Sequence, residues 1–391
     1  MTATPGPFSP PARILLGPGP AMVDPRVLQA MAQTPLGHLD PTFHGVMQDV
    51  RAMLRQAFRT SNPLTLAISG TGTAGMEAAI ANVVQPADRI VVCVAGYFGA
   101  RMAEMVRRLG GEAILVEVPW GEVVPAERVE ETLDSARRSG APARAVCLVH
   151  AETSTGVLQP LDDIVRLTHA HGAIVVVDAV TSLGGVALDV DGAGGGEGID
   201  LSYSGAQKCL GAPPGLAPLT AGARALAVME GRRTPPVSFN LDLALLERYW
   251  GRERAYHHTA PINSVYALRE ALRLAIDEGL DARVARHRRV HDQLRSGVAG
   301  LGLEFLVDER WRLPVLNALK VPDGVDDGAV RGRLLEEHNI EIGGGLGPLA
   351  GRIWRVGLMG YSAREENVAR FLTAMRIILG APRMSRPPRR T

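Results

Sequence analysis

The chain has 391 residues, 46% of them hydrophobic, and a formal net charge of +1, which favour a globular protein and exclude a general nucleic-acid-binding or anionic-membrane surface. Its three cysteines are too few for a disulfide framework and their spacing matches no zinc site, so we expect a reducing, cytoplasmic location and no bound metal. No apolar run reaches the ~18 residues needed to cross a bilayer, and residues 1–7 have no leader pattern, which predicts a soluble protein.

The N-terminal residues 1–16 are rich in proline, so we expect an arm that packs on another part of the protein. The sequence LLGPGP follows at residues 15–20. Its two Gly-Pro pairs predict a tight extended turn that redirects the chain. The alternative is that the turn brings bare backbone close to a ligand, and we name Gly19 as a candidate substrate contact on that ground.

From residue 63 to about residue 220, short β-branched and apolar runs alternate with helical stretches. Most of these runs are continuously apolar, as strands buried on both faces are. The pattern predicts an α/β fold whose mostly parallel, seven-stranded sheet binds ligands at the carboxyl ends of its strands. The predicted strands are residues 64–69, 90–94, 113–118, 145–150, 174–178, 201–204 and 216–220, and the predicted helices are residues 76–84, 99–109, 126–137 and 161–171.

Three strand ends in this region carry candidate cofactor ligands. The sequence SGTGTAG at residues 69–75 opens a helix, where backbone N–H groups, hydroxyl groups and the helix dipole favour a phosphate. A plain Gly-rich connection has a similar composition. Phe98 follows the next strand, and its ring either stacks on a cofactor or packs in the core. Thr153, with two further hydroxyl residues, either holds an oxygen of a cofactor ring or caps the following turn.

Asp178 and Lys208 point most directly to chemistry. Asp178 follows five apolar residues, and a carboxylate so near the buried end of a strand needs a charged partner. Lys208 stands where a short apolar run meets a Gly/Pro turn, and no other lysine occurs until Lys320. A lysine can lose its proton and form a Schiff base, whereas an arginine cannot. This favours pyridoxal phosphate, with Asp178 beside its pyridine nitrogen, over a solvated surface lysine.

The charge pattern changes beyond about Asp277, where an Arg-rich helix is predicted over residues 282–295 and an α+β segment follows. Arg355 lies in the apolar sequence IWRVGLMG at residues 353–360. Its guanidinium is either an ordinary edge-strand group or a two-pronged ligand for a carboxylate. Two other segments predict mobility: the Gly-rich residues 191–198 indicate a surface loop, and the basic residues 383–391 indicate a frayed tail.

Four segments together resemble one family closely: the strand that ends at Asp178, SGAQK at residues 204–208, STGVLQPLD at residues 154–162 and YHHT at residues 256–259. From about residue 15 to residue 374, the chain resembles the alanine–glyoxylate and serine–pyruvate aminotransferases, which belong to class V of the fold-type I pyridoxal-phosphate enzymes. The resemblance implies a homodimer with shared active sites. It also implies a large cofactor-binding domain and a small α+β domain, which we place after the arm of residues 1–16, over 17–277 and 278–391.

The resemblance further implies a role for each matched residue. Lys208 is expected to form the Schiff base, Asp178 to pair with the pyridine nitrogen and Arg355 to bind the substrate carboxylate. The phosphate ligands are expected to be Thr71, Gly72, Thr73 and Gln207, with Tyr256 and Thr259 donated by the other subunit. The chain departs from the family at three of the cofactor positions: Phe98 replaces a stacking tryptophan, Thr153 a serine near the ring, and Thr73 a histidine.

We therefore predict an aminotransferase that moves the amino group of L-alanine or L-serine to glyoxylate, or to pyruvate, in two half-reactions. Its partners are then small amino acids and 2-oxo acids, with no nucleic acid and no membrane. A rival is the ureidoglycine–glyoxylate aminotransferase of purine breakdown, which the chain resembles at residues 118–123, 207–211 and 347–349. Against it, Tyr256 stands where we expect that family to differ, and residues 37–41 match its substrate-side motif only in part. A protein of this fold that binds without turnover is disfavoured by the presence of Lys208, Asp178 and Arg355.

Overall fold

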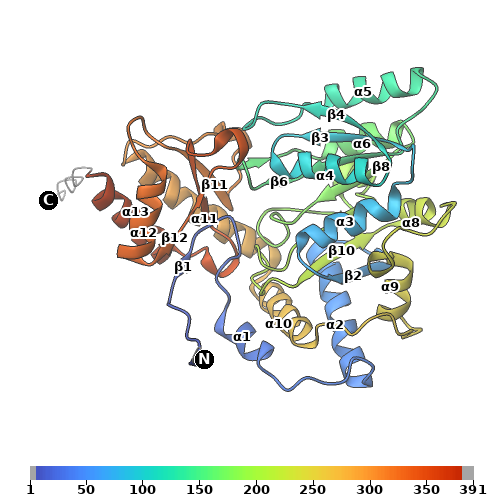
Figure 1. Ribbon diagram of the computed structural model, residues 1–391, viewed down its shortest axis with the longest axis horizontal. Helices are drawn as coiled ribbons and strands as arrows, with labels where there is room; N and C mark the ends of the chain where they lie inside the picture. Colours follow the sequence, from blue (N-terminus) through green and yellow to red (C-terminus); the bar gives the residue numbers. More distant parts are fainter. Residues whose placement is uncertain (1–5, 381–391) are drawn as a thin grey trace, which may run out of the picture.

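The computed structural model describes residues 6–380, so the first five residues of the expected arm and the basic residues 383–391 lie outside the described residues. A seven-stranded sheet dominates the larger part of the molecule (Figure 1). Its strand order is β2-β10-β9-β8-β5-β3-β4, with β10 antiparallel to both neighbours and the other pairs parallel. The strands are β2 (Leu64–Ser69), β3 (Arg89–Val94), β4 (Glu112–Glu117), β5 (Ala145–Val149), β8 (Ile174–Asp178), β9 (Leu201–Tyr203) and β10 (Leu216–Ala221).

All seven predicted strands are present, and no strand end differs from its prediction by more than one residue. The prediction succeeds because burial on both faces demands continuously apolar runs: β5 and β8 are buried at every residue. The register places Val149, Asp178 and Tyr203 beside one another at the carboxyl ends of three adjacent strands. The sheet thus delivers Asp178 to the edge where ligands of such folds bind.

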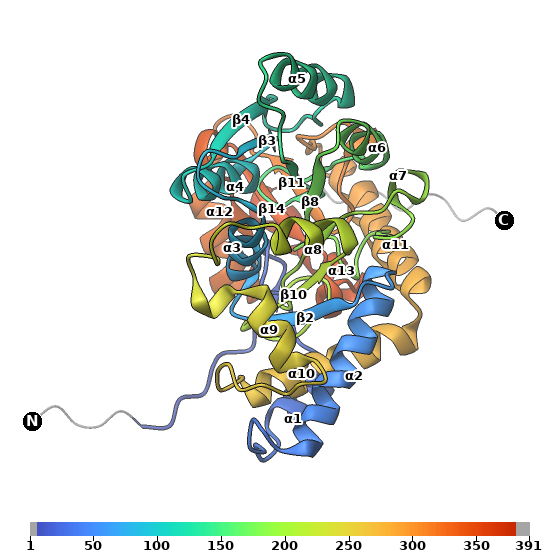
Figure 2. The ribbon, with the colours of Figure 1, turned by 90° about the vertical axis from the view of Figure 1, so that its right-hand side faces the viewer.

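Helices cover the sheet, with α3 and α4 on one side and α6 and α7 on the other (Figure 2). The helix α3 begins at Gly72, four residues before its predicted start, directly after the extended Thr71. The helices of this part are α1 (Pro25–Met31), α2 (Pro41–Phe58), α3 (Gly72–Val83), α4 (Tyr97–Arg108), α5 (Ala126–Arg138), α6 (Asp162–Ala170), α7 (Ala193–Gly196), α8 (Ala223–Glu230), α9 (Leu243–Trp250) and α10 (Ile262–Glu278). A short hairpin, β6 (Ala151–Glu152) with β7 (Val157–Leu158), follows β5.

The C-terminal elements form a second, smaller unit with its own hydrophobic core, at the left of Figure 1. It contains the helices α11 (Leu280–Ala299), α12 (Asp327–His338) and α13 (Glu365–Leu379) and a three-stranded sheet of β11 (Leu316–Lys320), β14 (Ile353–Gly357) and β13 (Gly343–Gly344). The chain passes from α10 to α11 at Gly279, whose φ of 82° favours glycine. Within the described chain, no helix is long and apolar enough to cross a bilayer.

The N-terminal segment packs on this second unit. The strand β1 (Ile14–Leu15) pairs in parallel with β12 (Ile340–Glu341), and Leu16 is fully buried in the second core. After Leu16, the chain crosses back to the large sheet, where the Ala21 N–H donates to the Gln207 carbonyl oxygen. The segment therefore touches both units before α1 begins.

The Gly-rich segment 191–198 contains the short helix α7 and is anchored rather than free. The Asp191 carboxylate accepts hydrogen bonds from the hydroxyl groups of Thr60 and Ser61. On the other side, the Arg224 guanidinium donates to the backbone and side-chain oxygens of Glu197. These contacts hold the segment against the rest of the protein, whereas its glycine content predicts a mobile surface loop.

Candidate active site

A cavity of about 160 Å³ lies at the carboxyl end of the sheet, between β5, β8 and the start of α3. It brings together eight of the residues that the sequence predicts for cofactor binding. Its lining consists of Thr71, Gly72, Thr73, Met76, Phe98, Val149, Ala151, Thr153, Asp178, Val180, Thr181, Gln207 and Lys208. Segments far apart in the sequence meet here because parallel strands present their carboxyl ends at one edge.

Lys208 enters this cavity from the loop between β9 and β10. Its ammonium donates to the Pro18 carbonyl oxygen, so the crossing N-terminal segment lies directly against it. Gly19 has a φ of 104°, and a Cβ added there would stand 2.6 Å from the Lys208 Nζ. The backbone conformation therefore favours glycine at this position, and any larger residue would also displace the end of the Lys208 side chain. The structure places Gly19 against the candidate Schiff-base lysine, although Gly19 does not line the cavity itself.

The environment of Lys208 favours its neutral amine. Burial lowers the pKa of the Lys208 ammonium to about 8, and the positive charge of Arg355 acts in the same direction. The Asp178 carboxylate opposes this shift but does not cancel it. A buried lysine with this pKa has a substantial unprotonated fraction near neutral pH, as an amine nucleophile or base needs.

Asp178 is the last residue of β8 and is 3% exposed. One carboxylate oxygen accepts the Val180 N–H at 2.8 Å, and the other accepts the Tyr203 hydroxyl at 2.9 Å. Burial raises the pKa of Asp178 to about 7, and these two hydrogen bonds limit the rise. No ion pair involves Asp178 in the part of the chain that the structure describes. A cationic N–H of a ligand would stabilise the ionised carboxylate at this place.

An anion cradle faces the same cavity. Thr71 makes no side-chain cap to α3, and the Gly72 and Thr73 N–H groups have no acceptor among the described residues, so both can bind an anion. The Gln207 side-chain oxygen is buried without a hydrogen-bond partner among the described residues. If the amide group is turned by 180°, its NH₂ group takes the place of this oxygen and can donate to a phosphate. Gly72 is tightly packed, since a Cβ there would stand 2.9 Å from a methyl carbon of Val180.

Phe98 lies in the first turn of α4 with its ring at the cavity. The Arg101 guanidinium stands 5.0 Å from the centre of this ring, and Tyr97 contacts it edge-on at 5.7 Å. The Phe98 backbone is held by a residue that the sequence analysis missed. The Glu152 carboxylate, 1% exposed, accepts the N–H groups of Phe98 at 3.2 Å and of Ser154 at 3.0 Å.

Glu152 thus joins the ring-bearing helix to the β6–β7 hairpin that carries Thr153. Burial raises the pKa of Glu152, while the hydrogen bonds from Ser154, Gly99 and Phe98 oppose the rise. The sequence does carry one signal for this role: Glu152 is an acidic residue three positions after the fully buried strand β5, much as Asp178 is an acidic residue at the end of β8. The three hydroxyl residues that follow Glu152 are the more conspicuous feature of this segment in the sequence.

Arg355 projects from β14 and is 7% exposed. Its Nε donates to the Gly344 carbonyl oxygen at 2.7 Å, and its Nη1 donates to the Thr153 carbonyl oxygen at 3.1 Å. Burial lowers the pKa of Arg355 to about 10. Neither contact is to a carboxylate, so this buried cation retains donors and charge for an anionic ligand. The bond to Thr153 connects Arg355 to a residue that lines the cavity.

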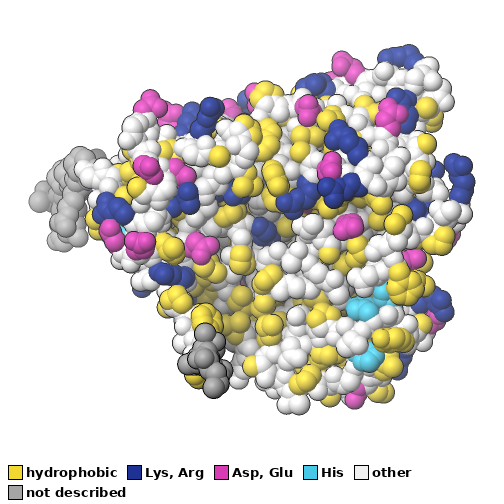
Figure 3. Space-filling model, viewed as in Figure 1, with side chains coloured by type: hydrophobic (Ala, Val, Ile, Leu, Met, Phe, Trp, Pro, Cys, Tyr) yellow, Lys and Arg dark blue, Asp and Glu magenta, His cyan; other side chains and the backbone are white. Residues whose placement is uncertain are grey.

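Tyr256 and Thr259 are the predicted ligands that this chain does not bring to its own cavity. Tyr256 is 65% exposed and contacts His38 with 5.4 Å between ring centres. Thr259 is also exposed. Between them, His258 forms a 2.7 Å hydrogen bond with the Ser69 hydroxyl at the start of the anion cradle. Histidine side chains gather on this lower part of the molecular face in Figure 3.

Comparison with known proteins gives consistent results. The family model for class-V aminotransferases matches residues 13–370. The chain is 37% identical over 387 residues to the (S)-ureidoglycine–glyoxylate transaminase of Bacillus subtilis, covering 94% of this chain and 91% of that protein. It is 40% identical over 374 residues to the alanine–glyoxylate aminotransferase of Rattus norvegicus, covering 95% of this chain and 88% of that protein.

Two solved structures are similar over nearly their whole length. The alanine–glyoxylate aminotransferase from Nostoc sp. has a TM-score of 0.93 and 48% sequence identity, covering 96% of this chain and 98% of that chain. The ureidoglycine–glyoxylate aminotransferase from Bacillus subtilis has a TM-score of 0.91 and 39% identity, covering 95% of this chain and 94% of that chain.

Proposed function

The chain belongs to the class-V aminotransferase family, and from this premise we propose that it transfers the amino group of L-alanine or L-serine to glyoxylate, with pyruvate as a second acceptor. With alanine and glyoxylate the products are pyruvate and glycine, so each half-reaction exchanges an amino group for a carbonyl oxygen. The names of the relatives support glyoxylate as the acceptor. The observation that carries the proposal is one cavity holding a buried lysine of lowered pKa, a buried carboxylate and an anion cradle.

Pyridoxal phosphate fits this set of residues. When bound, it supplies an electron sink that stabilises the negative charge left when the amino acid loses its Cα proton. Thr71, Gly72, Thr73 and Gln207 would hold the phosphate, and Phe98 would stack on the ring, with Thr153 near a ring oxygen. Asp178 would keep a proton on the ring nitrogen, because a buried carboxylate is stabilised by a cationic N–H. We propose that these residues make up the cofactor site.

Lys208 and Arg355 act on the substrate in this proposal. Lys208 would hold the cofactor through its Nζ, and its neutral amine would serve as the general base that takes the proton from the substrate Cα. Arg355 binds the α-carboxylate that alanine, serine and glyoxylate share, and so orients the Cα–H bond. Gly19 lets the N-terminal segment lie against Lys208, which supports our proposal that Gly19 contacts the substrate.

We further propose a homodimer with shared sites, because Tyr256 and Thr259 are exposed here and suit donation to a partner's phosphate. Exposed apolar side chains accompany them: Val237 is 85% exposed and Phe239 is 68% exposed. We also propose the domain limits 17–277 and 278–391, an arm over residues 1–16, and a cytoplasmic location.

The specific alternative is (S)-ureidoglycine as the amino donor, which a relative of nearly full coverage supports. Steady-state rates of glycine formation from glyoxylate, measured with L-alanine, L-serine and ureidoglycine, decide between these donors. A kcat/KM for alanine or serine at least tenfold above that for ureidoglycine supports the proposal, and the reverse order overturns it. No turnover with any of the three, in a protein that binds pyridoxal phosphate, would instead favour a binding protein.

A further inference from the structure

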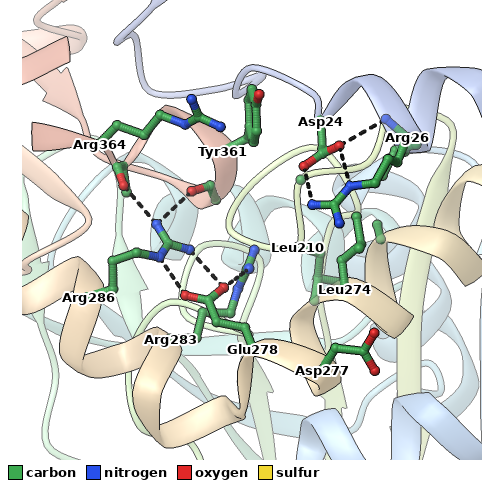
Figure 4. A pocket seen from close by; sticks show the side chains of 15 residues that line it. Asp24, Arg26, Leu210, Leu274, Asp277, Glu278, Arg283, Arg286, Tyr361 and Arg364 are labelled. Carbon is green, nitrogen blue, oxygen red and sulfur yellow. Dashed lines mark hydrogen bonds and ion pairs between the residues drawn. The ribbon is translucent and has the colours of Figure 1, made fainter. Parts of the chain in front are cut away.

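A network of one carboxylate and two guanidiniums lies where α10 ends and α11 begins (Figure 4). The Glu278 carboxylate binds the Arg283 Nη1 at 2.6 Å and the Arg286 Nε at 2.5 Å. Burial alone would raise the pKa of Glu278, but its hydrogen bonds and ion pairs with Arg286 and Arg283 hold that pKa below its ordinary value. Glu278 is therefore ionised and binds both cations at neutral pH.

Each arginine of this network also binds backbone carbonyl groups of loops. Arg283, 7% exposed, donates to the Cys209 carbonyl oxygen at 2.6 Å and to the Gly184 carbonyl oxygen at 3.0 Å. Cys209 directly follows Lys208, and Gly184 lies in the turn after Asp178. Arg283 thus connects α11 to the two loops of the large unit that follow the cavity residues Asp178 and Lys208.

Arg286 connects the same carboxylate to the small unit. Its Nη1 donates to the Gly360 carbonyl oxygen at 3.1 Å and to the Ala363 carbonyl oxygen at 2.7 Å. This loop follows β14, the strand that carries Arg355. Gly360 lies directly against the lysine loop, since a Cβ added there would stand 3.0 Å from the Cys209 carbonyl oxygen. His287 adds a further contact, because its Nε2 accepts the Gly360 N–H at 3.0 Å.

The two loops also meet through buried apolar side chains, since Cys209 and Met359 belong to one hydrophobic cluster, but the outer side of the network is open. A cavity of about 440 Å³ opens there, lined in part by Leu210, Gly360 and Arg286. The Arg286 side chain is 24% exposed. On this open side, hydrogen bonds and ion pairs hold the loops, in addition to the apolar cluster that contains Cys209 and Met359.

We infer that Glu278, Arg283 and Arg286 form a clamp that sets the spacing between Lys208 and Arg355. The clamp touches the loop after each of the residues proposed for the ring nitrogen, the Schiff base and the substrate carboxylate. Its members are positioning residues, because none of them lines the candidate active-site cavity. The inference rests on the proposed function, since spacing between these residues matters only when one ligand contacts both.

The first test is Arg286→Lys, which keeps the charge but replaces a planar guanidinium, whose Nε binds Glu278 and whose Nη1 binds two carbonyl oxygens, with a single nitrogen. Arg289→Lys is the matched control: it lies on the same helix, and its ion pair with Glu365 at 3.2 Å is exposed at both side chains. We expect kcat/KM for L-alanine to fall roughly ten- to hundredfold in Arg286→Lys, because a misplacement near 1 Å has effects of this size. KM for alanine and for glyoxylate should account for most of the loss.

An amine without a carboxylate distinguishes a changed spacing between Lys208 and Arg355 from a general loss of active-site structure. Ethylamine reacts at the lysine-bound cofactor without using Arg355, so its rate of displacing Lys208 should change less than about twofold in Arg286→Lys. Hydrogen–deuterium exchange gives a readout independent of activity. Backbone amides of residues 208–211 and 360–363 should exchange faster in Arg286→Lys than in wild type or Arg289→Lys.

Two results overturn the clamp: an unchanged kcat/KM for alanine, or an equal loss for alanine and ethylamine. Glu278→Asp, which keeps the charge but shortens its reach, should show the same split and replaces Arg286→Lys if that variant does not fold. Failure of the wild-type protein to transaminate any amino acid would count against the proposed function instead. The exchange experiment would then still show whether the clamp holds the two loops.

Discussion

Replacing Arg355 by lysine tests the candidate site most directly, because the change keeps the positive charge and removes the planar guanidinium. In the structure, Arg355 donates to two carbonyl oxygens and has no acidic partner among the described residues. A lysine ammonium cannot hold a carboxylate through two parallel hydrogen bonds. A bidentate charged contact is worth about 2–4 kcal/mol, so we expect kcat/KM to fall roughly thirty- to a thousandfold.

Stopped-flow measurement of each half-reaction checks this prediction. The rates with L-alanine and with glyoxylate should both fall, because both molecules carry the carboxylate that Arg355 is proposed to bind. The affinity for pyridoxal phosphate should change less than about twofold, since none of the proposed phosphate ligands contacts Arg355. Arg352→Lys is the matched control, because Arg352 is a nearby but exposed arginine. Unchanged kcat/KM for both substrates would refute the reasoning and leave Arg355 a structural residue of β14.

The remaining predictions concern the cofactor site and its partner. Lys208→Ala should abolish both transamination and the visible absorbance of a lysine-bound cofactor, and a borohydride-reducible linkage in this variant would contradict the assignment. Asp178→Asn should retain cofactor affinity better than turnover, because an amide does not keep the ring nitrogen protonated, whereas near-normal turnover would make Asp178 structural. Lys208→Ala mixed with the double variant Tyr256→Phe and Thr259→Ala should regain activity in hybrid dimers, unless the sites are not shared. The rate at which the protein without cofactor captures pyridoxal phosphate should rise with pH through about 8, because the neutral Lys208 amine attacks the aldehyde, and a flat profile from pH 6 to 9 would exclude that pKa.

The sheet and its cavity were predictable because each depends on a local signal. A strand buried on both faces must be apolar throughout, and the carboxyl ends of parallel strands meet at one edge. Asp178 and Lys208 therefore stood out as charged residues at the ends of apolar runs. The start of α3 was predicted too late because Gly72 and Thr73 suggest a loop by composition, whereas the structure makes them the first turn of a helix.

The supporting residues were not predictable in the same way. Glu152 and the clamp act through side-chain contacts with backbone groups of distant segments, and no spacing in the sequence marks such contacts. Arg283 and its carbonyl partner Cys209 are 74 residues apart, and Arg286 and Gly360 are also separated by 74. In the sequence these arginines belong to an Arg-rich helix that is typical of a solvated surface. Only the fold shows that two of them face inward.

Tyr256 and Thr259 are predicted ligands whose role requires a second chain. Their motif indicates cofactor ligands, yet the structure leaves both exposed and outside the cavity that contains Lys208. The neighbouring His258 instead bonds to Ser69, at the base of the anion cradle of the same chain. If a partner's phosphate binds Tyr256 and Thr259, this short segment contacts one cradle through His258 and the other through its exposed side chains. Cofactor binding at one site would then restrain the loop that completes the other, so we expect the two sites of a dimer to bind pyridoxal phosphate with unequal affinities. Calorimetric titration that resolves two identical, independent sites would exclude this coupling.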